Sequence, residues 1–168
     1  MGGSVAQAFA VRYPDRVDGL GLFDTTAWYG PNAPAAWEER AQKALSDGLS
    51  GLADFQKTRW FSDRFRETHP DVVQACLDVF LKNDLDPYAK TCRMLGAMDL
   101  RDDIAAIRCP TRILVGSEDY ATPPDMAQAM HARIKGSTLR VLEGARHLSP
   151  LESPEVVAGE LQQLIRRL

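Results

Sequence analysis

The chain has few cysteines, no long apolar run and little net charge, and each of these excludes a specialised class of protein. Its three cysteines, Cys76, Cys92 and Cys109, lie far apart, which argues against a disulfide framework or a zinc site and favours a reducing, cytoplasmic compartment. No stretch approaches the about 18 consecutive apolar residues of a membrane-spanning helix, and no basic and apolar leader is recognisable, so neither a membrane span nor a signal peptide is expected. The formal net charge is only −3 and no basic patch stands out, so we expect no nucleic-acid or membrane partner.

What the chain does contain is enough apolar surface for one hydrophobic core. Of its 168 residues, 45% are hydrophobic, which suits a single domain with one excursion. The pattern divides the chain into a core α/β segment (1–28), a helical cap or lid (29–106) and a second core α/β segment (107–168). In the first segment, apolar spacing predicts a helix from Val5 to Val11 and a short buried strand from Asp18 to Phe23.

The middle segment interrupts the alternation of strands and helices. A cluster of Gly, Pro and Asn from Tyr29 to Pro34 opens it, and the residues after the cluster have helical spacing. Helices are expected over residues 36–47, 51–60, 70–81 and 87–98, with a short element near Arg64. A helical excursion of this kind suggests a lid that excludes water and shapes a substrate pocket.

The last segment has a different period, which begins after Pro110. Strands are expected at 111–115 and 138–142, and helices at 125–134 and 154–168. This alternation predicts an α/β fold, in which a parallel sheet is covered by helices. The sheet would have only three strands, and its first strand would lack a neighbour on one side. We therefore expect the chain to be the second part of something longer.

An acid and a histidine follow the two strands of the last segment. Asp119 comes just after one apolar run, and His147 follows the next strand 28 residues later. Loops at the carboxyl ends of parallel strands carry catalytic side chains, so Asp119 is expected to orient the imidazole of His147, which acts as a base for a nucleophile. Asp24, after the first strand, is a rival acid, although our main expectation for it is a turn role, bonded to the backbone of Thr25 and Thr26.

The nucleophile itself is not evident. Met1-Gly2-Gly3 matches the last half of a nucleophile elbow, Gly-x-Ser-x-Gly, if a serine precedes Met1. Gly2 would then stand where strand and helix approach too closely for a Cβ, and the backbone N–H of Met1 would lie in the oxyanion hole. Ser4 is a rival nucleophile, but no strand precedes it.

Motifs spread over nearly the whole chain carry a family resemblance: Met1-Gly2-Gly3, Arg59-Trp60-Phe61, Asp99-Leu100-Arg101-Asp102, the run from Gly116 to Pro124, and the run from His147 to Glu152. With them, the sequence resembles the α/β-hydrolase family and, within it, the 3-oxoadipate enol-lactonases. The resemblance implies an eight-stranded sheet whose last three strands lie in this chain, a helical lid, and two of three triad residues. Arg146 departs from the pattern, because relatives usually have a small residue or glycine at this position.

The resemblance also implies an activity. It points to a serine hydrolase that cleaves a small carboxylic ester or lactone, most like 3-oxoadipate enol-lactone of aromatic catabolism, with no metal or organic cofactor. Trp60 would line the pocket, and Arg59 would bind a carboxylate of the substrate, although a tryptophan at helical spacing from Phe55 is more often part of a core.

Other functions stay open. The same scaffold suits a C–C bond hydrolase or a broad-range esterase. From a different class, the chain would be a truncated product or an inactive fragment that docks onto an amino-terminal half. The protein partners considered are this missing half and a second copy of the chain, in a homo-oligomer. Because the serine is missing, the chain by itself is expected to hydrolyse esters little or not at all.

Overall fold

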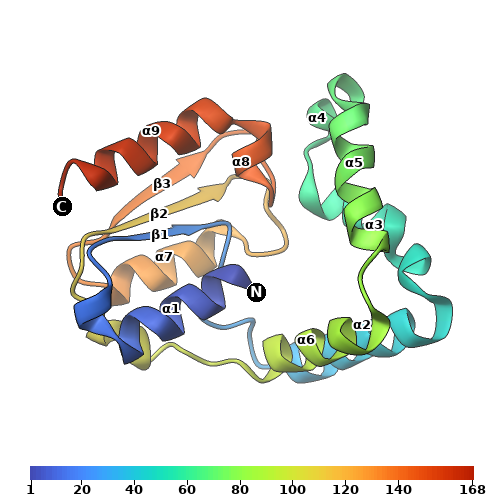
Figure 1. Cartoon of the computed structure of the whole chain (residues 1–168), viewed down its shortest axis with the longest axis horizontal. Helices are drawn as coiled ribbons and strands as arrows, with labels where there is room; N and C mark the ends of the chain where they lie inside the picture. Colours follow the sequence, from blue (N-terminus) through green and yellow to red (C-terminus); the bar gives the residue numbers. More distant parts are fainter. The chain divides into compact units, whose positions relative to one another are not determined.

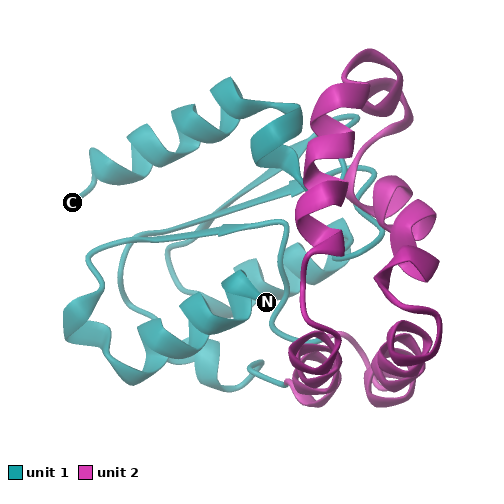
Figure 2. Ribbon diagram, turned by 45° about the vertical axis from the view of Figure 1, so that its right-hand side comes forward, with its two compact units in different colours: residues 1–28, 99–168 teal, residues 29–98 magenta.

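A computed structural model describes all residues, 1–168, as two compact units (Figure 1). Residues 1–28 and 99–168 form the first, which we call the sheet unit, and residues 29–98 form the second, the helical unit (Figure 2). The chain thus leaves the sheet unit after Trp28 and returns to it at Asp99. Each unit has its own buried core and is described by itself.

Three parallel strands make up the sheet, in the order β1 (Leu20–Phe23), β2 (Thr111–Gly116) and β3 (Thr138–Leu142). Leu20 pairs with Thr111, and Arg112 pairs with Thr138. Every residue of the central strand β2 is buried, as is usual for a parallel strand that is covered on both faces. The predicted α/β fold with three parallel strands is confirmed.

Helices cover both faces of this sheet. Figure 1 shows α1 and α7 on one face and α9 on the other. The helical elements of the sheet unit are α1 (Gly2–Arg12), η1 (Pro14–Arg16), η3 (Asp103–Ala106), α7 (Pro124–Arg133), α8 (Ser149–Glu152) and α9 (Pro154–Ile165). The core between sheet and helices is built from branched apolar side chains such as Leu22, Ile113 and Val115, which are fully buried. Burial of this kind is the main favourable term in folding.

The helical unit consists of α2 (Ala33–Asp47), η2 (Leu49–Leu52), α3 (Ala53–Trp60), α4 (Asp63–Thr68), α5 (Pro70–Leu81) and α6 (Leu85–Ala97). Helices α2 and α6 pack closely, because Gly96 has no side chain: a Cβ there would lie 3.0 Å from the Cβ of Trp37. A second cluster joins Leu49, Leu77 and Phe80, with Trp60 packed against it. Small and apolar residues at helical spacing therefore give this unit a core of its own.

The return to the sheet unit comes earlier than the sequence predicted, at residue 99 instead of residue 107. Trp28 and Asp99 form an isolated antiparallel bridge, and the N–H of Leu100 donates to the carbonyl of Ala27 at 2.9 Å. Ile104 is fully buried in the core of the sheet unit. The turn η3 has helix-like apolar spacing, and only its packing shows that it belongs with the sheet.

Most predicted elements are present, and α5 and β3 have the predicted bounds. The stretch predicted as one helix over 51–60 is instead the 3-10 turn η2 followed by the helix α3. Gly48, at φ +73°, ends α2, and the chain forms this 3-10 turn before α3 begins. The four-residue helix α8 was not predicted, since one turn is too short to show a periodic pattern. No helix of the chain combines the length and the apolar character that a bilayer crossing requires.

Candidate active site

The site begins at the carboxyl end of β2, where the chain turns sharply. A Cβ on Gly116 would lie 2.1 Å from the carbonyl oxygen of Ala145, so only glycine lets the loop after β3 come this close. Two backbone hydrogen bonds hold the contact: Ser117 N–H donates to Leu142 at 2.8 Å, and Glu118 N–H donates to Ala145 at 3.0 Å. The loops that carry Asp119 and His147 are thereby fixed against each other.

Asp119 and His147 meet at this point. The Nδ1 of His147 lies 2.9 Å from Oδ2 of Asp119, which is 1% exposed. The other carboxylate oxygen accepts from the backbone N–H groups of Ala121, at 2.7 Å, and Thr122, at 3.0 Å. The hydroxyl of Thr122 donates to Oδ2 at 2.8 Å. The carboxylate therefore has a fixed orientation, and both of its oxygens are used.

These contacts decide the charge of Asp119. Burial alone would raise its pKa, but the hydrogen bonds from His147 and Thr122 and the charge of the imidazole together lower the pKa below its usual value. Asp119 is therefore ionised at neutral pH. An ionised partner at Nδ1 favours the tautomer with its proton on Nδ1, which leaves Nε2 as an acceptor.

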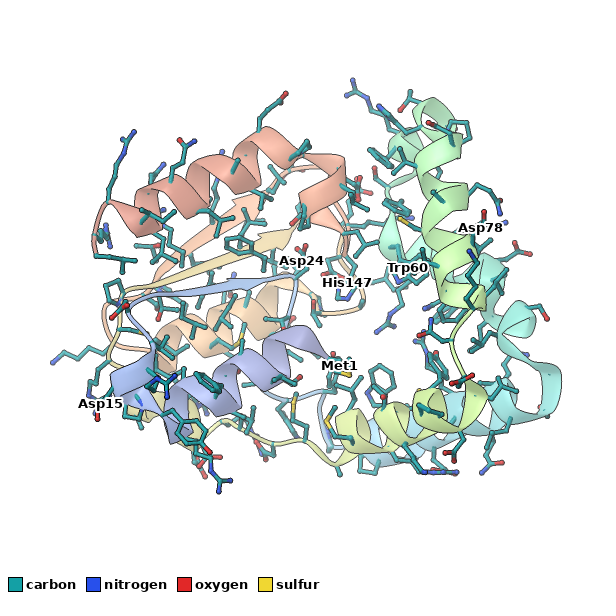
Figure 3. All side chains as sticks on the ribbon, in the orientation of Figure 1. Met1, Asp15, Asp24, Trp60, Asp78 and His147 are labelled. Atoms are coloured by element: carbon teal, nitrogen blue, oxygen red, sulfur yellow. The ribbon has the colours of Figure 1, made fainter.

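The side chain of His147 keeps one nitrogen available. The imidazole is 23% exposed, and Nε2 makes no hydrogen bond within the chain. A histidine whose Nδ1 is held by a carboxylate and whose Nε2 is open can accept a proton from a nucleophile. Figure 3 shows His147 beside Asp24, at the carboxyl ends of the strands.

Asp24 has a different role from the one predicted. Its carboxylate does not bond the backbone of Thr25 or Thr26. Instead, Oδ2 accepts from the N–H of Ser149 at 3.0 Å and from its hydroxyl at 2.5 Å. Burial raises the pKa of Asp24 to about 6, against the lowering effect of the Ser149 bonds and of His147. The partner is 125 residues away in sequence, so no local pattern could have indicated it.

Arg146, the departure from the family pattern, is engaged with its surroundings. Its Nε lies 3.7 Å from a carboxylate oxygen of Glu118, and its guanidinium stacks 5.7 Å from the ring of Tyr120. Its backbone N–H donates to Glu152 at 2.8 Å. The positive charge next to His147 is therefore partly neutralised by Glu118, which is half-exposed.

The amino-terminal residues are arranged differently from the expectation in one respect. A Cβ on Gly2 would meet nothing within 4 Å, whereas a Cβ on Gly3 would lie 2.2 Å from the hydroxyl oxygen of Thr25. Within this chain it is Gly3 that has no room for a side chain. The carbonyl of Met1 accepts from the N–H of Ser4 at 2.9 Å and opens α1. The oxyanion role of Met1 stays a prediction.

Ser4, the rival nucleophile, does not contact the histidine. It is buried on α1, its hydroxyl has no hydrogen-bond partner, and no bond joins it to His147. The geometry does not support Ser4 as the group that His147 would activate.

Trp60 and Arg59 lie in the helical unit. The ring of Trp60 is edge-on to Phe80 at 5.5 Å and packs against the core cluster of Leu49, Leu77 and Phe80. This packing is typical of a core tryptophan. The guanidinium of Arg59 stacks on Trp37 at 5.8 Å and on Phe55 at 5.7 Å. Their substrate-binding roles stay predictions.

The side chains do not form a metal centre. No group of three or more His, Cys, Asp or Glu side chains is placed to hold an ion, and the three cysteines are free thiols.

Comparison with known proteins gives a consistent result. The chain is 30% identical over 167 residues to 3-oxoadipate enol-lactonase 2 of Acinetobacter baylyi, and the match covers 99% of this chain and 61% of the relative. It is 34% identical over 145 residues to 3-oxoadipate enol-lactonase 1 of the same organism, with 81% of this chain and 54% of the relative covered. The chain thus spans little more than half the length of these relatives.

Solved structures agree. The enol-lactonase of Burkholderia xenovorans superposes with a TM-score of 0.91 at 32% identity, covering 99% of this chain and 63% of that one. A thermophilic esterase of Thermogutta terrifontis gives a TM-score of 0.89, also at 32% identity, with 99% and 62% covered. The alpha/beta hydrolase family as a whole matches residues 1–160. The chain therefore belongs to the α/β hydrolase family.

Proposed function

We propose that this chain carries the acid and the base of a serine hydrolase that cleaves a small carboxylic ester or lactone, and that its substrate is 3-oxoadipate enol-lactone. The observation that carries the proposal is the bond between His147 Nδ1 and the buried carboxylate of Asp119. The enol-lactonases among its relatives support the choice of substrate. No cofactor takes part in the proposed reaction.

In this mechanism, a serine from a segment ahead of Met1 attacks the carbonyl carbon of the substrate. Nε2 of His147 takes the hydroxyl proton as the new C–O bond forms, and Asp119 stabilises the resulting imidazolium. The backbone N–H of Met1, at the start of α1, donates to the oxyanion, where the helix dipole also favours negative charge. The imidazolium then protonates the leaving oxygen. Water, deprotonated by His147, releases the acyl group and restores the serine.

The surface of the sheet unit is suited to contact with the amino-terminal segment that would carry the serine. Strand β1 pairs only with β2, so its other edge has no strand partner. Four apolar side chains at intervals of four residues are exposed along α1: Met1, Val5, Phe9 and Tyr13. An open strand edge beside an exposed apolar helix face favours the docking of further strands and helices. An amino-terminal half is the proposed occupant, and a second copy of the chain is the alternative.

The helical unit contains arginines that could bind a carboxylate of the substrate. Arg40 and Arg59 both stack on the rings of Trp37 and Phe55, at 5.1 to 5.8 Å. The guanidinium of Arg40 already donates to Tyr88 and Gln56, which leaves half-buried Arg59 as the proposed carboxylate ligand, since guanidinium groups bind carboxylates well. The Thermogutta terrifontis esterase was solved with malate, itself a dicarboxylate. These observations support an anionic acyl group as substrate.

To test the proposal, the chain is fused to the segment that precedes the matched region in 3-oxoadipate enol-lactonase 2. We call this fusion the joined protein. Hydrolysis is measured on 3-oxoadipate enol-lactone, on p-nitrophenyl acetate and on a dienone C–C substrate. We expect the joined protein to hydrolyse the lactone and His147→Ala to abolish this activity. Preference for p-nitrophenyl acetate would favour the broad esterase, and cleavage of the dienone would favour the C–C hydrolase.

Two controls address the inactive-fragment alternative. The 168 residues alone should turn over p-nitrophenyl acetate at the background rate. Activity of the chain alone that disappears in Ser4→Ala would identify Ser4 as the nucleophile instead. A folded joined protein that hydrolyses none of the three substrates would overturn the proposal, provided that its circular dichroism matches that of an active relative.

A further inference from the structure

Asp24 has the most unusual backbone in the chain. At φ +49°, it is the one residue other than glycine in the left-handed region, which residues with a Cβ avoid. Its N–H still donates to Leu114 at 2.9 Å, so the turn follows directly on the paired part of β1. Strained backbone at the end of a strand is common where a side chain must be aimed at a functional group.

The strained turn directs the carboxylate to the segment that carries His147. Its Oδ2 accepts both the N–H and the hydroxyl of Ser149, which is fully buried and lies two residues after the histidine. Asp24 itself is 7% exposed. Because this buried carboxylate accepts two hydrogen bonds, it holds the turn between His147 and α8 against the end of β1.

Asp24 also acts on the imidazole through its charge. The charged groups that face it are His147, which lowers its pKa, and Asp119, which raises it. Burial raises this pKa to about 6, and the second carboxylate oxygen, Oδ1, is buried without a hydrogen-bond partner. Two carboxylates therefore act on a single imidazole, one through a direct hydrogen bond and the other without one.

We propose that Asp24 is a positioning residue for His147: its carboxylate clamps Ser149, and with it the turn that carries the imidazole, and adds a second negative charge to the surroundings of the ring. The part of this proposal that assigns the effect to catalysis rests on the proposed function. The clamp and the coupling to His147 are properties of the chain itself and can be tested without a substrate.

Asp24→Asn separates charge from position, because an asparagine oxygen can still accept from Ser149. NMR titration of the side-chain carboxyl carbons gives the readout for charge, with the Asp24 signal assigned by its absence in Asp24→Asn. In the unaltered chain, Asp24 should titrate near pH 6, and His147→Ala should raise the pKa of Asp24 further, because the charge of His147 lowers it. Amide exchange gives the readout for position, and Asp24→Asn should leave exchange around residues 147–149 slow.

Three further measurements make the test selective. His131→Ala removes another histidine of the sheet unit and should leave the Asp24 titration unchanged. Ser149→Ala removes one of the two clamp bonds and keeps the charge of Asp24, so it should speed amide exchange around residues 147–149. Asp24→Ala should speed that exchange further.

An Asp24 titration that is the same in His147→Ala as in the unaltered chain would overturn the charge part of the proposal. Unchanged amide exchange in Ser149→Ala and Asp24→Ala would overturn the clamp. Neither result depends on hydrolysis. If the joined protein is inactive but both effects are seen, then the proposed function fails while the positioning role of Asp24 stands.

Discussion

The carbonyl oxygen of Ala145 lies where a side chain on Gly116 would have to be: the two would approach to 2.1 Å. This contact brings the loop after β3 against the end of β2, and so joins the segments of Asp119 and His147. A contact with backbone cannot be relieved by a rotamer change. The glycine is therefore a structural requirement of the candidate site.

Gly116→Ala should destabilise the chain by about 2 to 3 kcal/mol, because the loop must move to make room for the methyl group. Denaturant unfolding gives the free energy of unfolding, and the NMR signal of His147 reports the displaced loop. Gly159→Ala is the matched control. A Cβ there meets nothing within 4 Å, and alanine in the middle of α9 should add about 0.5 to 1 kcal/mol. Equal effects of both substitutions would contradict the steric argument.

Asp119→Asn should remove most of the activity of the joined protein. An amide at this position no longer stabilises imidazolium and favours the wrong tautomer, so kcat should fall by about 10³- to 10⁴-fold. KM should change little, since the carboxylate does not bind the substrate. Steady-state kinetics on the lactone separates the two parameters. Retention of more than a tenth of kcat would mean that another acid, with Asp24 the first candidate, orients His147.

The pH dependence of stability should reveal the buried carboxyl of Asp24. Its pKa rises from 3.8 in the unfolded chain to about 6 in the fold, so the folded state holds the proton more tightly. This contribution is complete below about pH 4 and is lost as the pH rises through 6. Relative to Asp24→Asn, the unaltered chain should therefore lose up to about 3 kcal/mol of stability between pH 4 and pH 7.

Urea unfolding of both proteins at several pH values measures this difference. Asp119 works in the opposite direction: its pKa is lowered in the fold, so its contribution is present at neutral pH and lost on acidification. Because both proteins contain Asp119, its effect cancels in the comparison. A difference between the two proteins that does not vary with pH would show that Asp24 titrates normally.

Glu160 should be among the costliest charges to remove. It is buried on α9 and bonds both Arg112, in the buried strand β2, and Arg140, at 2.9 Å. Glu160→Ala leaves Arg112 buried without its partner and should cost about 3 to 5 kcal/mol in a urea melt. Asp47→Ala removes the exposed pair with Lys43 and should cost less than about 1 kcal/mol. Similar losses for the two variants would refute the role of burial.

Arg59→Ala tests the proposed recognition of a substrate carboxylate. In the joined protein, KM for the lactone should rise roughly 10-fold or more, because a charge-assisted bond to the substrate is lost. Hydrolysis of p-nitrophenyl acetate, which has no carboxylate, should not change. Arg59→Lys should restore part of the affinity. A rise in KM for both substrates would instead indicate a packing role on Trp37 and Phe55.

The sequence by itself determined the parts of this protein that depend on local pattern. Apolar periodicity located the three strands and most of the helices, and the strand ends placed Asp119 and His147 on loops at one edge of a sheet. The middle segment was recognisable as a separate helical excursion. Its return point, at residue 99, was not, because the turn before β2 has the same helical spacing as the excursion itself.

Tertiary structure alone decided which of these residues meet. The register of β2 and β3 and the absence of a side chain at Gly116 bring Asp119 to 2.9 Å from His147. The bond between Asp24 and Ser149 spans 125 residues and depends on a left-handed turn that nothing in the neighbouring sequence requires. Local sequence specifies secondary structure through propensity and period, whereas the environment of a buried carboxyl group depends on the packing of distant segments.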